Sequence, residues 1–282
     1  MDNVLFLYLL ALLWTLFATA QDLKKRIISN WVVVSLIIFA MGFRFFYSAF
    51  ELEEFNFFYQ GVFGLAVFFI VGNLFYYSRF FAGGDAKMMV ALGTILPLSI
   101  GFVSNLNIFV YFLLTFLFIG GFYGLVWSLV LAFFGKNFSN YKKEFGNQFT
   151  KNKFSVLTAS MLGIFLIFLY RIDFFISYLG IMVLLFPFLY LHAKAVDETS
   201  LVKTIKPLEL EEGDWLYKDL HLGRKKIISR WGGLTKKEIA EIRKRVKKVR
   251  IRYGIPFAPV FFISLLVWIY FIVSKSYISF VF

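Results

Sequence analysis

The sequence of 282 residues contains no cysteine and only two histidines, His192 and His221. Without cysteine the chain can form neither a disulfide bond nor a zinc site with thiolate ligands. The two histidines are far apart in the sequence and do not make a metal site by themselves, so we expect no metal and no other cofactor. We expect His192 at a membrane interface and His221 on a surface. The start Met1-Asp2-Asn3 lacks the positive charge of a cleavable signal peptide, and none is expected.

Hydrophobic residues, in contrast, are abundant and occur in long blocks. They make up 60% of the chain, and phenylalanine alone accounts for 40 residues. A soluble domain of this length is nearer half apolar, and blocks of this kind are typical of membrane-spanning helices. The sequence therefore predicts an all-α polytopic membrane protein with about eight transmembrane helices and a small cytoplasmic segment before the last helix.

The eight expected spans differ in how well they match the thickness of a bilayer. In chain order they are Val4–Ala20, Trp31–Phe50, Phe57–Tyr77, Met88–Val103, Ile108–Phe134, Phe154–Tyr170, Phe174–Leu191 and Ile255–Val273. The fourth span is short for a helix that must cross about 30 Å of hydrocarbon, and it contains Pro97. The orientation of every later segment depends on this span.

Basic residues are concentrated in every second loop. If the N-terminus lies outside, the inner loops are 21–30, 78–87, 135–153 and 194–253, and they hold 27 of the 30 lysines and arginines. Loops rich in lysine and arginine remain in the cytoplasm, so this asymmetry predicts the orientation. It also explains the net charge of +13 without a nucleic-acid partner.

Arg44 is the basic residue that lies inside an expected span. At 1.5 Å per residue it is about 9 Å from the outer end of its helix. We expect its side chain to extend outward to the acidic residues Glu51, Glu53 and Glu54. Asp173 is also expected on the outer face.

The composition divides the chain into three parts. Residues 1–193 form the expected transmembrane domain, 194–253 a basic cytoplasmic segment, and 254–282 the final helix and C-terminus. Within the middle part, Thr235 and Glu238 have the spacing of a helix capping box. Apolar residues then follow at helical spacing: Ile239, Ile242, Val246 and Val249. This helix would either lie on anionic lipid or, as we prefer, belong to a small domain; RNA binding is a more distant alternative.

Two aspartates lie at the ends of expected spans. Asp22 follows the first span, and Asp85 precedes the fourth, in Gly83-Gly84-Asp85-Ala86-Lys87. The chain crosses the membrane twice between them, so both carboxylates belong to the same membrane face. Carboxylates at membrane depth are costly and are usually functional. Two of them that share one proton can activate water, which is typical of aspartyl proteases.

Each of these residues also has a simpler interpretation. Asp22 would serve as an interfacial charge, Asp85 as the N-cap of the next helix, and Lys87 as a cytoplasmic anchor. Asp214 lies in a highly charged stretch and is expected to be a solvated loop residue. Two further functions remain open: a presenilin-like protease that cleaves within a membrane helix, and a transporter whose carboxylates line an ion path.

The segments Asp22-Leu-Lys-Lys-Arg-Ile-Ile-Ser-Asn30 and Gly83-Gly84-Asp85-Ala86-Lys87 resemble the two signature regions of the type IV prepilin peptidases, most closely the archaeal preflagellin and prepilin branch. The resemblance implies that Asp22 and Asp85 are the catalytic pair and that Gly83, Gly84 and Lys87 support them. It also implies substrates with a short basic leader before a hydrophobic helix, cut at the cytoplasmic face. The expected partners are such prepilin or preflagellin precursors and membrane lipid.

The sequence departs from the family pattern at a few positions. Ala82 replaces the first glycine of the family's GxGD motif, and Ser29 stands where bacterial members often have proline. Bacterial members usually carry a cysteine-rich zinc loop and methylate the product. Because this chain has no cysteine, we expect cleavage without methylation. The later segment Gly254-Ile-Pro-Phe-Ala-Pro259 is similar to the C-terminal extension of some archaeal members.

Overall fold

A computed structural model describes residues 2–50, 55–97, 101–135, 138–223 and 225–274 of the chain. The acidic residues Glu51, Glu53 and Glu54 lie outside this described part. The chain forms two compact units, one of residues 1–124 and 255–282 and the other of residues 125–254. Helix α5, Phe102–Phe133, begins in the first unit and ends in the second.

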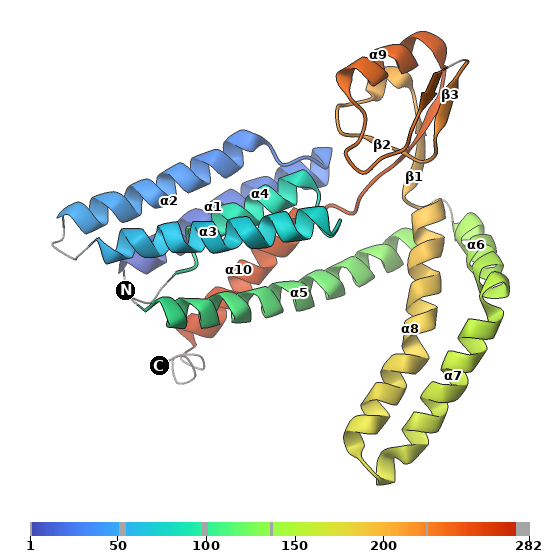
Figure 1. Cartoon of the computed structure of the whole chain (residues 1–282), viewed down its shortest axis with the longest axis horizontal. Helices are drawn as coiled ribbons and strands as arrows, with labels where there is room; N and C mark the ends of the chain where they lie inside the picture. Colours follow the sequence, from blue (N-terminus) through green and yellow to red (C-terminus); the bar gives the residue numbers. More distant parts are fainter. Residues whose placement is uncertain (1, 51–54, 98–100, 136–137, 224, 275–282) are drawn as a thin grey trace. The chain divides into compact units, whose positions relative to one another are not determined.

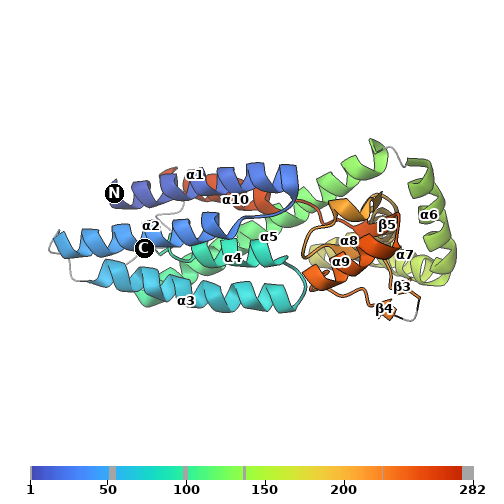
Figure 2. The ribbon, with the colours of Figure 1, turned by 90° about the horizontal axis from the view of Figure 1, so that it is seen from above.

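The first unit is a bundle of apolar helices (Figures 1 and 2). Besides the beginning of α5 it contains α1 (Asp2–Lys25), α2 (Asn30–Phe50), α3 (Asn56–Tyr77), α4 (Gly83–Leu92) and α10 (Ala258–Val273). Helix α1 packs against α2 and α10, while α4 packs against α2 and α3. Helices α1 and α10, the first and last of the described helices, therefore lie side by side (Figure 2).

The second unit combines helices with a small sheet domain. Its helices are α6 (Phe138–Lys151), α7 (Lys153–Phe168), the 3-10 turn η1 (Leu169–Arg171) and α8 (Phe174–Thr199). Helices α7 and α8 form a hairpin in which Gly163 and Gly180 face each other. A Cβ atom added to either glycine would lie 2.8 Å from the other's carbonyl oxygen. These glycines therefore let the two backbones touch, as small residues do between membrane helices.

The sheet domain follows α8 (Figure 1). Its elements are β1 (Val202–Ile205), η2 (Pro207–Glu209), β2 (Trp215–Leu216), β3 (Leu220–Leu222), β4 (Lys225–Ile227), α9 (Lys236–Arg245) and β5 (Val249–Arg252). Strand β5 lies between β1 and β2 in an antiparallel sheet, and β3 and β4 form a hairpin. None of these strands was predicted from the sequence.

The capping box predicted for the basic segment is present at the start of α9, where Thr235 and Glu238 hydrogen-bond reciprocally. The predicted helix nevertheless ends earlier than its apolar spacing suggested. Val246 adopts an extended conformation, and Val249 lies in β5, where buried and exposed side chains alternate. Ile239 and Ile242 are buried in the core of this domain. The burial of these two residues in a core agrees with the small-domain alternative.

The membrane spans follow the sequence prediction closely. Each of the eight expected segments has a helical counterpart, and six of the described helices are long and apolar enough to cross a membrane. Many of their large apolar side chains are exposed, which suits contact with lipid tails. The chain is therefore a multi-pass membrane protein. Helix α10, with 16 residues, is shorter than these six.

The fourth expected span is where the prediction of a continuous helix is wrong. Helix α4 has only 10 residues and ends at Leu92, followed by a turn and Pro97. Here α4 and α3 are in backbone contact, because a Cβ added to Gly64 would lie 2.0 Å from the carbonyl oxygen of Gly93. Proline and this close approach end the helix. The freed carbonyl groups then need hydrogen-bond donors, since hydrocarbon supplies none.

Arg44 supplies those donors, and its predicted outward extension is wrong. The side chain is fully buried, with 0% of its surface exposed. Its Nε donates to the carbonyl of Thr94 at 2.8 Å, and its Nη2 donates to those of Ile95 and Pro97 at 3.2 and 2.7 Å. Its Nη1 donates to Phe57 at 2.9 Å. The planar fork of five N–H groups suits this cluster of carbonyl acceptors.

We predict that Arg44→Met destabilises the folded protein strongly. Each buried carbonyl that stays unpaired costs about 1–3 kcal/mol. The thermal unfolding midpoint of the purified protein in detergent measures the effect. Arg171→Met is the control, because Arg171 is exposed at the end of η1. Equal midpoints for the two variants would contradict the role assigned to Arg44.

Candidate active site

Asp22 lies in the last turns of α1 and is buried, with 6% of its surface exposed. Its Oδ2 atom accepts a hydrogen bond of 2.8 Å from the backbone N–H of Ala258, the first residue of α10. The backbone N–H of Phe257 donates to the same carboxylate. A helix start has N–H groups without partners in the helix, and a carboxylate is well suited to accept from them. Asp22 therefore caps a helix that is remote in the sequence.

Asp85 lies in the first turn of α4, and the backbone N–H of Ala82 donates to its carboxylate. Ala82 has the extended conformation of an N-cap residue, so the simpler alternative, in which Asp85 itself is the N-cap, is wrong. The charge of Asp22 acts directly on Asp85. The structure thus brings these two carboxylates from α1 and α4 within electrostatic range of each other.

Two further contacts hold the predicted motifs together. Gly84 packs against the turn after α1, since a Cβ added to it would lie 3.2 Å from Cβ of Ile28. The Nζ of Lys87 donates a hydrogen bond of 2.8 Å to Oδ1 of Asn30, the first residue of α2. Lys87 therefore links the second motif to the end of the first, which is more than an anchoring role. Gly83 instead has open space, with Tyr76 as its nearest neighbour at 3.8 Å.

The contribution of α10 to this site was not predicted from the sequence. Ala258 and Phe257 reach Asp22 across more than two hundred residues, and no local pattern signals such a contact. Tyr123, on α5, was also missed; its hydroxyl interacts electrostatically with Asp22 and Arg26. One feature of the sequence did indicate that a helix begins here: Pro259 lies near the start of an apolar run, and proline is common in the first turn of a helix.

The other acidic residues considered in the sequence serve local structure. Asp173 caps α8 by accepting a hydrogen bond of 2.7 Å from the N–H of Phe175. Asp214 accepts from the N–H of Glu211 in a loop, and burial raises the pKa of its carboxyl. These contacts agree with the interpretation of Asp214 as a loop residue.

The histidines also lie outside the pair of carboxylates. His192, which was expected at an interface, is buried in the second unit, where Ser128 and Tyr141 hydrogen-bond to its two ring nitrogens at 3.0 and 2.9 Å. His221 is exposed on β3, as expected. Across the described ranges, no group of three histidine, aspartate or glutamate side chains is placed to hold a metal ion.

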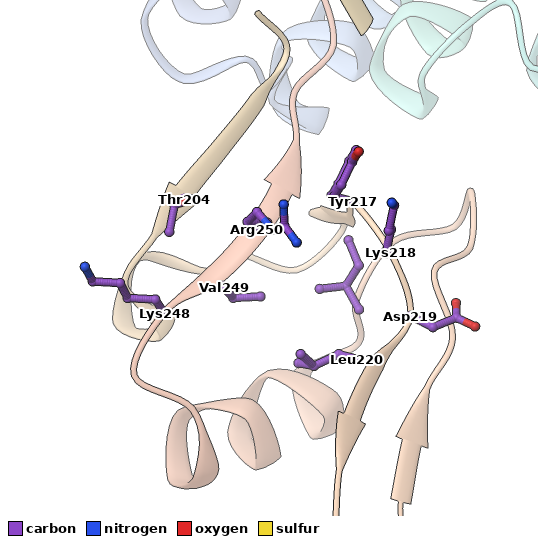
Figure 3. Close-up of a pocket in the computed structure, with 9 residues that line it drawn as sticks. Thr204, Tyr217, Lys218, Asp219, Leu220, Lys248, Val249 and Arg250 are labelled. Atoms are coloured by element: carbon purple, nitrogen blue, oxygen red, sulfur yellow. The ribbon is translucent and has the colours of Figure 1, made fainter. Parts of the chain in front are cut away.

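The sheet domain has a hollow of about 360 Å³ that contains neither candidate carboxylate (Figure 3). Basic side chains from the loop after β2 and from β5 surround it, among them Lys218 and Arg250, which lie near the ring of Tyr217. Asp219 also borders the hollow, but Lys226 pairs with it at 2.7 Å. Its hydrogen bonds from Lys226 and the N–H of Ser229 lower the pKa of its carboxyl. Asp219 is thus charged and engaged, so it is a poor candidate for acid–base chemistry.

We predict different effects of two substitutions at Asp22 on stability. Asparagine retains an oxygen that can accept from Ala258, so Asp22→Asn should unfold near the wild-type temperature. Asp22→Ala loses the cap of α10, a loss that costs about 0.5–2 kcal/mol in other helices. Thermal unfolding in detergent compares the two variants. If Asp22→Ala were as stable as Asp22→Asn, the capping contact would not contribute to folding.

Comparison with known proteins bears on the part of the chain that holds both carboxylates. Residues 9–134 match the model of the type IV leader peptidase family. A preflagellin peptidase from Methanococcus maripaludis is 29% identical over 107 residues, which cover 36% of this chain and 46% of that relative. The chain thus matches less than half the length of this relative. No solved structure matches the chain. The family match confirms the resemblance carried by the segments around Asp22 and Asp85: residues 9–134 are similar to the type IV leader peptidase family.

Proposed function

We propose that this chain is a membrane aspartyl endopeptidase that removes short leader peptides from prepilin-like or preflagellin precursors. The observation that supports this most is the approach of Asp22 and Asp85, which come from the two signature segments and interact electrostatically. The family match over residues 9–134 and the name of the archaeal relative support the class of substrate.

In the proposed mechanism the two carboxyl groups share the work of acid and base. An ionised aspartate takes a proton from a water molecule, whose oxygen attacks the carbonyl carbon of the scissile peptide bond. The protonated aspartate first donates to the carbonyl oxygen. The aspartate that took the proton from water then gives it to the leaving nitrogen as the peptide bond breaks, and one hydroxyl proton of the intermediate returns to the other aspartate. Two neighbouring carboxylates favour this arrangement because repulsion prevents both from ionising together.

The backbone donors around the carboxylates suggest how the roles divide. Asp22 receives N–H groups from Phe257 and Ala258, whereas Asp85 receives one from Ala82. Hydrogen bonds from backbone N–H groups and the positive end of a helix favour the charged form of a carboxylate. We therefore assign Asp22 as the base and Asp85 as the acid in the first step.

Space beside Asp85 suits a peptide substrate. Gly83 has no neighbouring atom closer than 3.8 Å to an added Cβ, and Gly84 follows it at the start of α4. A substrate backbone can approach glycine more closely than any other residue. Gly84 has a different role, because it lets α4 approach Ile28. An extended precursor segment would pass Gly83 and place its scissile bond between the carboxylates.

We predict that Asp22→Asn and Asp85→Asn each abolish cleavage of a candidate precursor while the protein stays folded. Each variant keeps the size of the side chain and removes the carboxyl group that the reaction needs. Mass measurement of the products formed by purified protein in detergent gives the readout. A product cut before the hydrophobic helix agrees with leader removal, and one cut within that helix indicates a presenilin-like protease. Cleavage that survives either substitution would rule out the two-carboxyl mechanism.

We further propose that the carboxylates lie at the cytoplasmic face, with the N-terminus outside. The support is the charge distribution, since 27 of 30 basic residues fall in the loops on that side. The absence of native cysteine allows single cysteine reporters to be introduced. A cysteine at exposed Lys25 should resist a membrane-impermeant thiol reagent in intact cells and react after lysis, whereas one at exposed Arg171 should react in intact cells. The opposite labelling pattern would invert the proposed orientation.

A further inference from the structure

We propose that the start of α10, residues 257–261, positions both carboxylates for catalysis. This inference rests on the proposed function and deepens it. The segment lies outside residues 9–134, which match the peptidase family. It nevertheless contacts both signature segments, one through backbone hydrogen bonds and the other through aromatic rings.

The first contact fixes the side chain of Asp22. The N–H of Ala258 donates to Oδ2 at 2.8 Å, and the N–H of Phe257 donates to the same carboxylate. Ala258 is buried, with 1% of its surface exposed. Two donors from a rigid helix start restrict the rotation of the carboxylate, which a single flexible partner would not do.

The second contact fixes the segment that carries Asp85. The ring of Phe81, four residues before Asp85, is buried between rings from α10 and α5. Its centroid lies 5.8 Å from that of Phe257 and 6.1 Å from that of Phe261. Phe116 on α5 lies 4.9 Å from Phe261 and 5.9 Å from Phe81, which closes the cluster. A shift of Phe257 or Phe261 therefore moves the loop that begins α4.

A third contact sets how far α10 is displaced along α1. The indole Nε1 of Trp268 donates to the hydroxyl of Tyr8 at 3.0 Å, and both side chains are buried. The two helices are thus joined near Tyr8 and again at Asp22. With both points held, α10 cannot slide along α1 without breaking a buried hydrogen bond and leaving its groups unpaired, which is costly in a protein interior.

Adjacent glycines on α5 provide a matched pair of variants. A Cβ added to Gly120 would lie 2.9 Å from the ring atom Cζ of Phe257, whereas one added to Gly121 would have no atom within 4 Å. Gly120→Ala must displace the Phe257 ring, which neighbouring rings hold in place. Gly121→Ala makes the same chemical change in the same helix without this clash.

The first test compares the kinetics of precursor cleavage by these two variants. Displacement of catalytic groups by about 1 Å can cost on the order of 100-fold in rate, so we expect Gly120→Ala to lower kcat about 10- to 100-fold. KM should stay unchanged, because the clash is with Phe257, which supports the carboxylates and does not itself bind the precursor. Gly121→Ala should match the wild type in both constants. An unchanged kcat in Gly120→Ala would overturn the positioning role even though the peptidase activity itself stands.

A second test does not depend on activity. Hydrogen exchange at the backbone N–H groups of Phe257 and Ala258 reports their bonds to Asp22. We expect exchange in Asp22→Asn to be close to wild type and exchange in Asp22→Ala to be at least about tenfold faster, which corresponds to about 1.4 kcal/mol. Equal exchange in all three proteins would overturn the inference. If the N–H groups of Phe257 and Ala258 were protected from exchange in a wild-type protein that cleaves no precursor, the proposed function would be rejected, but the contact with Asp22 would stand.

Discussion

The contact between the Asp22 carboxylate and the first N–H groups of α10 joins the two ends of the chain at the candidate active site. A buried carboxylate in a membrane protein needs partners, and an uncapped helix start needs an acceptor. The N–H groups of the helix start give the carboxylate its donors, and the carboxylate gives the helix start its acceptor. The last helix, although remote in sequence from the signature segments, thereby becomes part of the unit that holds Asp22 and Asp85. This contact explains how a side chain can be both structural and available for chemistry: its Oδ2 atom is bound by Ala258, and its charge acts on Asp85.

The short helix α4 carries the other carboxylate of the candidate site. Its first turn presents Asp85, and its last turn ends deep in the bundle, where Arg44 binds the carbonyl groups of Thr94, Ile95 and Pro97. A short helix of this kind places a carboxylate and its flanking glycines at a helix start. The early end of α4 leaves several backbone carbonyl groups without partners in the helix, and the guanidinium of Arg44 donates hydrogen bonds to them. A buried guanidinium therefore lies at the end of the element whose first turn carries Asp85.

Much of this arrangement follows from sequence. Long apolar blocks predicted the membrane-spanning helices, apart from the continuous fourth helix, and they indicated that Asp22 and Asp85, whose carboxylates interact electrostatically, lie at the ends of such spans. Local patterns also predicted the capping box of α9. The rest depends on contacts between distant residues. Neither the burial of Arg44 against the end of α4 nor the bond from Ala258 to Asp22 leaves a local pattern. The strand at Val249 was missed because its spacing from Ile242 also suits a helix.

The central claim, that Asp22 and Asp85 meet, can be measured without a substrate. The chain has no cysteine, so Asp22→Cys and Asp85→Cys introduce a single pair of thiols. A bifunctional thiol reagent much shorter than a membrane helix should crosslink them within one chain, detected by mass after proteolysis. The control pairs Asp22→Cys with Tyr59→Cys, because Tyr59 lies at the opposite end of α3 from Tyr76, about 25 Å away at 1.5 Å per residue, and Tyr76 borders Gly83. We predict a crosslink for the first pair and none for the control. No crosslink in the folded first variant, or equal crosslinking in both, would contradict the account.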